Sequence, residues 1–404
     1  MNRFLMISLL ASAATAPVTS GVAEADLESR IDVALDAAVR FLLDAQSPDG
    51  AWRSQTYGCF RDDPALTPLV LSSLGPLVAD SEEHRTAVHG GVSYLVAMVD
   101  EQGSIRPPSS GLAFPVYTAA SASWAVMMDS PTEEHTRAQR AWVQYLLRYR
   151  LGSDLGWQPS DPQFGGWGYA PVIPRKVEGA SSSETPFESN LSATLFGLAA
   201  LRLGPVPLED AAYGEVRLFV QRCQNFREDL EQADSAYDDG GFFFTTSDAA
   251  RNKAGLAGLD RFGRTRFRSY GSATADGLRG LLLCGLPRDH PRVAAARRWL
   301  ERHFVESTNP GTFGSDREVL QNATYYYYCW SVAHAFLALN LDEIEQAAGP
   351  VYWADKLAVE LLDRQRPDGS WASRFTDSKE DDPLVATPFA VAALAICRRM
   401  VSDE

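Results

Sequence analysis

The sequence predicts an all-α fold in which six helical hairpins close into a barrel. Amphipathic helices form the expected outer ring, and helices that are apolar on every face form the inner ring. Three observations support this prediction: a repeat shared by the two ends of the chain, aromatic–aliphatic doublets along the amphipathic helices, and apolar runs that follow glycine-containing turns. With 404 residues, of which 45% are hydrophobic, the chain is long and apolar enough to bury a large core.

The clearest repeat pairs two segments near the ends of the chain. One reads Gln-Ser-Pro-Asp-Gly-Ala-Trp, and the other reads Gln-Arg-Pro-Asp-Gly-Ser-Trp. An acidic pair and then a Thr-Pro pair follow each segment; these are Asp62-Asp63 and Thr67-Pro68 in the first unit, and Asp381-Asp382 and Thr387-Pro388 in the last. We therefore expect the two ends to share one structural unit. Its fixed structural positions are Gln46, Gly50, Trp52, Gln365, Gly369 and Trp371.

Each unit is interpreted as an amphipathic helix, a turn and a buried helix. Ile31, Leu35 and Leu42 lie at helical spacing on one face, and Gly50 can take the left-handed conformation that ends a helix. The run 384–396 is apolar on every face, which is typical of a buried helix. Similar apolar runs lie at 117–128, 191–203, 273–286 and 325–339.

We expect a single domain, residues 26–404, that consists of six repeats. Their approximate bounds are 31–80, 85–130, 135–204, 210–287, 290–342 and 350–400. An open solenoid satisfies the same periodicity, but it usually needs polar repeats at its ends. Because the two end repeats are the most alike and the most apolar, the sequence favours closure of the first repeat against the last.

Residues 1–25 have the pattern of an export signal. Arg3 precedes an apolar stretch from Phe4 to Ala14, and Ala23-Glu24-Ala25 fits a cleavage site better than Ala14-Thr15-Ala16 does. This predicts a periplasmic or extracellular protein; the alternative is a disordered apolar start on a cytosolic one. No other window has 18 apolar residues without a charge, so we expect no transmembrane helix in the mature chain.

Charge and cysteine content restrict the possible partners. The 52 acidic and 37 basic side chains give a net charge of −15, which argues against nucleic acid as a partner. The five cysteines have no CxxC spacing, so they indicate neither a disulfide framework nor a zinc site. A bridge between Cys59 and Cys397 stays open. We predict no cofactor and no metal.

At the level of these repeats the chain resembles a known family. The pattern Gln-x3-Gly-x-Trp after the doublet Phe41-Leu42 resembles the QW repeat of squalene–hopene and other terpene cyclases. The related prenyltransferase β-subunits are similar in their Gly-Gly-aromatic turns. The resemblance covers roughly residues 31–400 and implies an (α/α)6 toroid with a central cavity that takes an isoprenoid.

The catalytic motifs of that family are missing from the sequence. The Asp-x-Asp-Asp motif of class II cyclases does not occur, and Lys379 stands where its first Asp belongs. Asp-Asp-x-x-Asp is missing as well. Cys329 and His334 are five residues apart in one predicted helix, so they lie on different faces and do not match the family's zinc ligands. Whether the protein is an enzyme therefore stays open.

Three acidic residues are candidates for catalysis. Asp276 lies in an apolar run, where burial raises a carboxyl pKa and suits a general acid; it can equally pair with Arg279 or cap the helix. Asp239 and Asp382 belong to acidic pairs that precede inner helices or their turns. Capping is the simplest role for such pairs, and convergence on one mouth of the toroid, as in (α/α)6 glycosidases, is the functional alternative.

Two further groups are candidates for ligand binding. Large aromatic residues are expected to approach the central cavity, where they either bind a ligand or plug the toroid; they are Tyr325, Tyr326, Tyr328, Trp330, Trp167 and Phe242. The segment 251–268 is strongly basic and is expected to receive an anion or to pair with acidic neighbours. Its candidate anion-binding residues are Arg261, Arg264, Arg266 and Arg268.

Three functions remain compatible with these features. The first is an exported protein that binds or transforms an isoprenoid or other lipid in an aromatic cavity. The second is a noncatalytic toroid with a protein or glycan partner. The third is a carbohydrate-active enzyme that uses the acidic pairs.

Overall fold

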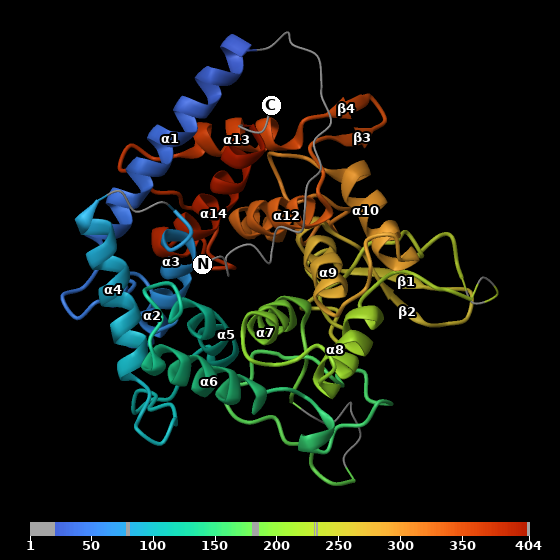
Figure 1. The fold of residues 1–404 in the computed structure, drawn as a ribbon. Helices are drawn as coiled ribbons and strands as arrows, with labels where there is room; N and C mark the ends of the chain where they lie inside the picture. The colour runs from blue at the N-terminus through green and yellow to red at the C-terminus, as the bar shows by residue number, and fades with distance from the viewer. Residues whose placement is uncertain (1–20, 78–80, 180–185, 230, 232, 402–404) are drawn as a thin grey trace.

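The computed structural model describes residues 21–77, 81–179, 186–229, 231 and 233–401, and these residues form a ring of helices around one axis (Figure 1). The inner helices are α3 (Leu66–Leu74), α5 (Pro115–Ala125), α7 (Leu191–Leu203), α9 (Gly271–Leu283), α12 (Tyr325–Leu339) and α14 (Pro383–Val401). The outer helices are α1 (Gly21–Asp44), α4 (Glu82–Ala97), α6 (Glu133–Leu147), α8 (Ala211–Arg222), α10 (Pro291–His303) and α13 (Trp353–Arg364).

Shorter elements lie in the connections between these helices. They are α2 (Gly58–Arg61), α11 (Glu318–Ala323), the 3-10 helix η2 (Ser153–Leu155), and the antiparallel pairs β1 (Leu256–Leu259) with β2 (Thr265–Phe267) and β3 (Ile344–Gln346) with β4 (Gly349–Val351). The β1–β2 hairpin projects from the side of the ring in Figure 1. It lies in the basic segment 251–268.

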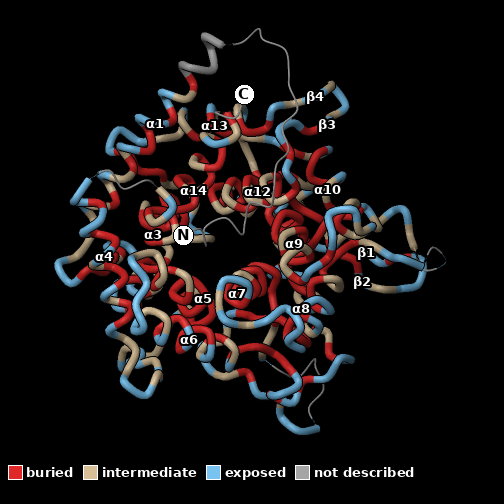
Figure 2. The backbone as a smooth tube through the Cα atoms, viewed as in Figure 1, coloured by how far each residue is buried: buried red, intermediate tan, exposed pale blue. Residues whose placement is uncertain are grey.

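The ring is closed. Each inner helix contacts the next, and α14 contacts α3, while α1 contacts α13, α14 and α4 (Figure 1). The predicted barrel of six helical hairpins is therefore confirmed, and the first repeat packs against the last. Figure 2 shows that the inner helices are almost entirely buried, as their lack of a polar face requires.

The glutamine of each terminal turn joins two outer helices. Gln46 Nε2 donates to the carbonyl of Ala87 in α4 at 2.9 Å, and Gln365 Nε2 donates to the carbonyl of Ala34 in α1 at 2.8 Å. The second contact connects the last repeat to the first. The side-chain amide thus satisfies a helical carbonyl of the neighbouring repeat and fixes the spacing between repeats.

In four of the turns a threonine of the inner helix binds the aromatic residue. Thr67 Oγ1 accepts the backbone N–H of Trp52 at 3.1 Å, and Thr387 Oγ1 accepts that of Trp371 at 3.0 Å. Thr194 and Thr274 accept in the same way from Trp167 and Phe242. The Trp52 indole also donates to the carbonyl of Leu42 at 2.7 Å, so the buried ring leaves no polar atom unpaired.

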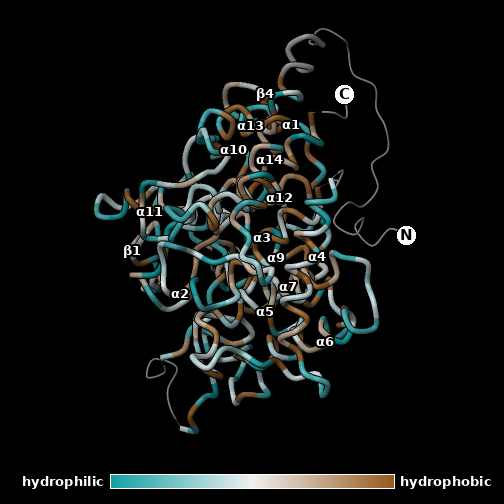
Figure 3. Tube along the Cα trace, turned by 90° about the vertical axis from the view of Figure 1, so that its left-hand side faces the viewer, coloured by the Kyte–Doolittle hydropathy of each residue, from teal (hydrophilic) through white to brown (hydrophobic). Residues whose placement is uncertain are grey.

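Apolar side chains follow the inner helices. The side view in Figure 3 shows apolar residues along α12 and α14, and more polar ones around α11. By length and hydropathy α14 resembles a membrane span, but 72% of that window is buried inside the protein. Its apolar character is explained by its place in the inner ring.

Two other predictions bear on the ends of the chain and on the thiols. The first outer helix begins at Gly21, well before the predicted start of the first repeat. Of the predicted export signal, residues 1–20 lie outside the described residues. Cys59 and Cys397 are free thiols, so the bridge between them, which the sequence left open, is not formed.

Candidate functional site

The axis of the toroid contains a cavity of about 1230 Å³. Its walls come from all six inner helices and from the outer helices α1, α4 and α6. It reaches the surface at the carboxyl ends of the inner helices, where Asp32, Asp36, Pro76 and Arg399 are exposed. Most of the wall is apolar; its aliphatic part includes Leu35, Val39, Leu69, Leu77, Met127, Met128, Leu195, Leu337 and Ile396. Such a wall suits an apolar ligand.

Aromatic side chains from four inner helices form the deep part of the cavity. They are Trp124 of α5, Phe196 of α7, Trp330 of α12 and Phe389 of α14. The ring centroid of Phe196 lies 6.1 Å from that of Trp124 and 5.5 Å from that of Trp330, and Trp330 lies 5.5 Å from Phe389. The faces of such rings attract cations and pack well against unsaturated or branched hydrocarbon chains.

Two nitrogen-bearing side chains line the same deep part. The Arg279 guanidinium carbon lies 4.3 Å from the centroid of Trp330. His334 Nδ1 lies 2.8 Å from the carbonyl oxygen of Trp330, so Nδ1 carries the hydrogen. Burial, together with the nearby charge of Arg279, lowers the pKa of His334 to about 3, and the imidazole is therefore neutral at neutral pH.

Asp276 is buried immediately behind this wall. Its carboxylate accepts hydrogen bonds from the hydroxyls of Ser331 and Tyr327, the latter at 2.8 Å. Burial raises the pKa of Asp276 to about 6, although these hydrogen bonds and the charge of Arg279 act in the opposite direction. The carboxyl is therefore mostly ionised at neutral pH.

A chain of hydroxyl groups extends from Asp276 across the ring. Tyr327 Oη lies 2.8 Å from Ser192 Oγ in α7, and Tyr117 Oη of α5 donates to the same Ser192 oxygen at 3.1 Å. Four inner helices are thus joined by one polar network beside an apolar cavity. Such a network fixes the relative positions of the helices that carry the aromatic wall.

Of the six predicted cavity residues, only Trp330 lines the cavity. Tyr325 and Tyr328 donate to the carbonyls of Glu306 and Val305, and the Trp167 indole donates to the carbonyl of Leu146. Tyr326 is buried against Tyr325, with ring centroids 5.1 Å apart, and Phe242 packs against Gly277. The tyrosine that belongs to the polar network of Asp276, Ser192 and Tyr117 is Tyr327, which was not among the predicted cavity residues. The spacing of Tyr327, Trp330, Ser331 and His334 on one helical face is the signal that identifies it.

The other two candidate acids make structural contacts. Asp382 accepts from the Ser54 hydroxyl and, at 2.9 Å, from the backbone N–H of Leu384 at the start of α14. Asp239 accepts from the indole of Trp299 at 3.1 Å and from Ser269 Oγ at 2.8 Å. The structure therefore brings neither carboxylate to the cavity. Among the described residues, no three His, Cys, Asp or Glu side chains are grouped as metal ligands.

The arginines of the basic segment are largely paired with other groups of the protein, most of which lie outside the segment. Arg266 forms ion pairs with Asp238 and Asp260, and Arg264 pairs with Asp260 at 2.7 Å. Arg261 donates to the carbonyls of Glu231 and Ala233 at 2.8 Å, and Arg268 lies 3.4 Å from the carbonyl of Thr312. The positive charge that the sequence suggested for an anion is thus mostly offset by the protein's own groups.

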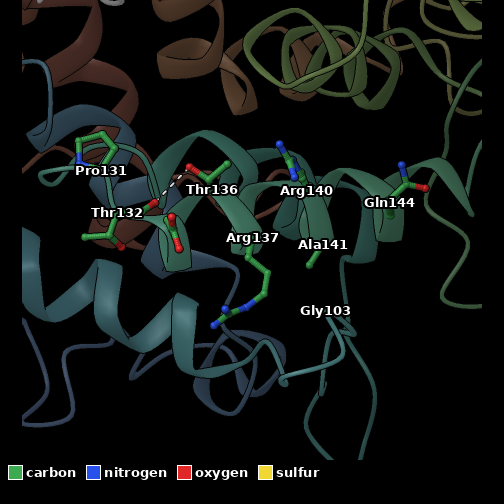
Figure 4. A pocket seen from close by; sticks show the side chains of 9 residues that line it. Gly103, Pro131, Thr132, Thr136, Arg137, Arg140, Ala141 and Gln144 are labelled. Carbon is green, nitrogen blue, oxygen red and sulfur yellow. Dashed lines mark hydrogen bonds between the residues drawn. The ribbon is translucent and has the colours of Figure 1, made fainter.

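A second hollow of about 750 Å³ lies on the outer surface, along α6. Figure 4 shows that its two arginines, Arg137 and Arg140, point in different directions. Arg137 is also 3.5 Å from Glu134. The hollow is therefore a polar surface groove without a concentrated charge, and we place the candidate site in the axial cavity.

Comparisons with known proteins agree with this architecture. No family model and no curated protein matches the chain. Among solved structures, the type II terpene cyclase MstE from Scytonema superposes with a TM-score of 0.53 at 15% identity, covering 92% of this chain and 99% of that one. An arginine-to-alanine variant of the same cyclase, in complex with its substrate geranylgeranyl dihydroxybenzoate, gives 0.52 at 14% identity over 93% and 99% of the two chains. Cellobiose 2-epimerase from Spirochaeta thermophila gives 0.60 at 13% identity over 95% and 99%. At these identities the likeness establishes the fold alone: the chain is an (α/α)6 toroid of the kind found in type II terpene cyclases and in cellobiose 2-epimerase.

Proposed function

We propose that the toroid binds an isoprenoid, or a lipid of similar length, in its axial cavity. The observation that carries the proposal is the wall of Trp124, Phe196, Trp330 and Phe389 at the end of a mostly apolar cavity. At about 1230 Å³ the cavity exceeds the roughly 300–1000 Å³ of pockets for drug-sized ligands, so an extended hydrocarbon chain fits it. The geranylgeranyl chain that the similar cyclase binds is of this class.

The chemistry of Asp276 favours binding over cyclisation. An acid that protonates an alkene must hold a proton and be strong enough to release it to carbon. Both oxygens of Asp276 instead accept hydrogen bonds, and its pKa of about 6 leaves it mostly unprotonated at neutral pH. We therefore propose a carrier or binding role, in which Asp276 acts as a fixed negative charge behind the aromatic wall.

The cavity is also a poor match for a sugar. A carbohydrate site needs several polar groups that converge on hydroxyls, and a hydrolase needs two carboxyl groups that flank one bond. The carboxylates that line this cavity are Asp32, Asp36 and Asp129, at its rim, and Asp129 is already hydrogen-bonded to His89 at 2.6 Å. We also propose that the protein is exported, because residues 1–25 have the pattern of an export signal.

A cavity-filling substitution tests the proposal. Ala199 lines the cavity, so Ala199→Trp places an indole where the ligand would lie, whereas Ala211→Trp adds the same group at an exposed position of α8. We expect the wild-type chain and Ala211→Trp to bind geranylgeraniol equally. We expect Ala199→Trp to bind it at least about 10-fold more weakly, since the indole occupies the ligand's volume.

Native mass spectrometry and the ligand-induced rise in melting temperature measure this binding. A ligand present at about 100 times its Kd stabilises the folded state by about 2.7 kcal/mol. Equal binding by Ala199→Trp and the wild type would place the ligand elsewhere. If the wild type bound neither geranylgeraniol nor squalene, the proposal would fail, and a protein or glycan partner would become the better hypothesis.

A further inference from the structure

The guanidinium group of Arg279 has unused hydrogen-bonding capacity inside the cavity. It carries five N–H donors, yet its hydrogen bonding within the described residues consists of one long contact, 3.4 Å to Ser331 Oγ. One face of the group lies over Trp330. In the part of the chain that the structure describes, no carboxylate oxygen lies within 4.0 Å of it. Most of its donors are thus available to a ligand.

Asp276 is the nearest candidate to form an ion pair with Arg279, and the hydrogen bonds of its carboxylate explain why the two side chains do not touch. Its two oxygens are occupied by Tyr327 Oη and Ser331 Oγ, and Ser331 stands between the carboxylate and the guanidinium, donating to the first and accepting from the second. The two charges stabilise each other through space without contact. A buried guanidinium without a direct anion is costly, and an anionic ligand group would remove that cost.

His334 adds an acceptor beside these donors. It follows Trp330 by one helical turn and lines the same part of the cavity. Because Nδ1 donates to the carbonyl of Trp330, the neutral ring presents Nε2 as an acceptor. A ligand group that both accepts from Arg279 and donates a hydroxyl to His334 would satisfy the two residues together.

The positive charge in this part of the cavity favours an anionic group with a single negative charge. Arg279 supplies a single positive charge, and the other arginines that line the cavity, Arg398 and Arg399, lie at the rim. Arg398 is also paired with Asp32 at 2.7 Å. A diphosphate carries two or three negative charges and would be poorly compensated, whereas a carboxylate carries one and matches the planar guanidinium with two parallel hydrogen bonds.

We propose that Arg279 and His334 form a head-group subsite for an isoprenoid or lipid carboxylic acid. The carboxylate accepts from Arg279, a hydroxyl beside it donates to His334 Nε2, and the hydrocarbon chain extends toward the rim. This inference rests on the proposed function and adds the chemical class of the head group. It also fixes the orientation of the ligand, since the aliphatic wall lies between the subsite and the opening.

Three ligands that share one chain test the subsite: geranylgeranoic acid, its methyl ester and geranylgeraniol. At pH 7.5, where the free acid is ionised, we expect the wild type to bind the acid at least about 10-fold more tightly than the ester or the alcohol. We expect Arg279→Met to bind the acid no better than the ester, and to bind the ester within about 3-fold of the wild type. Isothermal titration calorimetry with detergent-solubilised ligand gives these ratios.

His334→Phe keeps the shape of the ring and removes the acceptor, and it should weaken binding of a chain-matched 2-hydroxy acid more than that of the plain acid.

Removal of Arg279 takes away the larger of the two cationic charges that stabilise the buried Asp276 carboxylate and leaves only the weaker influence of Lys253, and this alone can prevent folding. The double variant Arg279→Met/Asp276→Asn removes both charges and should show the same loss of preference for the acid. Equal binding of acid and ester by the wild type would overturn the head-group subsite while leaving the proposed function intact. Failure of all three ligands to bind would overturn the proposed function itself.

Discussion

Replacing Gly369 by alanine is expected to lower the free energy of unfolding by about 3–4 kcal/mol, a large loss for one added methyl group. Gly369 has φ +86°, which is a left-handed conformation that glycine adopts readily and alanine does not. A Cβ at this position would lie 2.4 Å from the carbonyl oxygen of Ala37 in α1. That oxygen belongs to helical backbone and cannot move away without disturbing the first outer helix.

Gly103→Ala is the matched control. Gly103 occupies the corresponding turn of the second repeat with φ +75°, and a Cβ there would meet nothing within 4 Å. Its replacement by alanine should lower the free energy of unfolding by about 1–2 kcal/mol, which is the cost of placing alanine in the left-handed conformation without a steric clash. Urea denaturation of the three proteins gives the difference directly. Similar losses for the two variants would mean that the contact of the last turn with α1 does not contribute to closure of the ring.

The fold was predictable because its information is local and repeated. Gln46, Gly50 and Trp52 recur as Gln365, Gly369 and Trp371, and the contacts made by one set are made by the other. Apolar runs without a polar face can be buried only inside a second layer of helices. Together these two features determine both the rings and their closure, with no knowledge of long-range contacts.

The cavity was less predictable, because the face of a helix that meets the axis depends on how the ring closes. Tyr325, Tyr326 and Tyr328 are large aromatic residues on an inner helix, but they turn toward α10 and the loop that follows it or pack among themselves. Tyr327 alone of the four meets the central network. Composition identified the correct helix, and only the i, i+3, i+4, i+7 spacing identifies the correct face.

The basic segment shows why an anion site predicted from local charge can be wrong. A count of charges between residues 251 and 268 finds one acid, Asp260, against six cations. The partner that offsets Arg266 is Asp238, which lies upstream of that window and is brought to it by the β1–β2 hairpin. Charge inside a window of sequence is thus a weak indicator of an anion site when the segment folds back on an acidic neighbour.

Asp276 is expected to make the stability of the protein depend on pH between about pH 4 and pH 6.5. Burial is the largest influence on this carboxyl and raises its pKa from 3.8 to about 6 in the folded state. For an acid whose pKa is raised by folding, the contribution to stability is fully present below the unfolded pKa and is lost as the pH rises through the folded pKa. The pKa shift of Asp276 changes the free energy of unfolding by about 3 kcal/mol in total, and about 2 kcal/mol of this is lost between pH 4.5 and pH 7.5.

The measurement is the free energy of unfolding of Asp276→Asn minus that of the wild type, at several pH values. Asparagine does not titrate, so this difference should rise by about 2 kcal/mol in favour of the variant from pH 4.5 to pH 7.5, whatever constant cost the altered hydrogen bonds to Ser331 and Tyr327 add. Comparing the two proteins also cancels the contribution of Glu380, whose pKa burial raises to about 8. Glu101→Gln removes an exposed carboxylate and controls for the change in net charge. A difference that stays constant with pH would mean that Asp276 is as well solvated in the folded protein as in the unfolded chain, and that it is therefore not a fixed buried charge behind the aromatic wall.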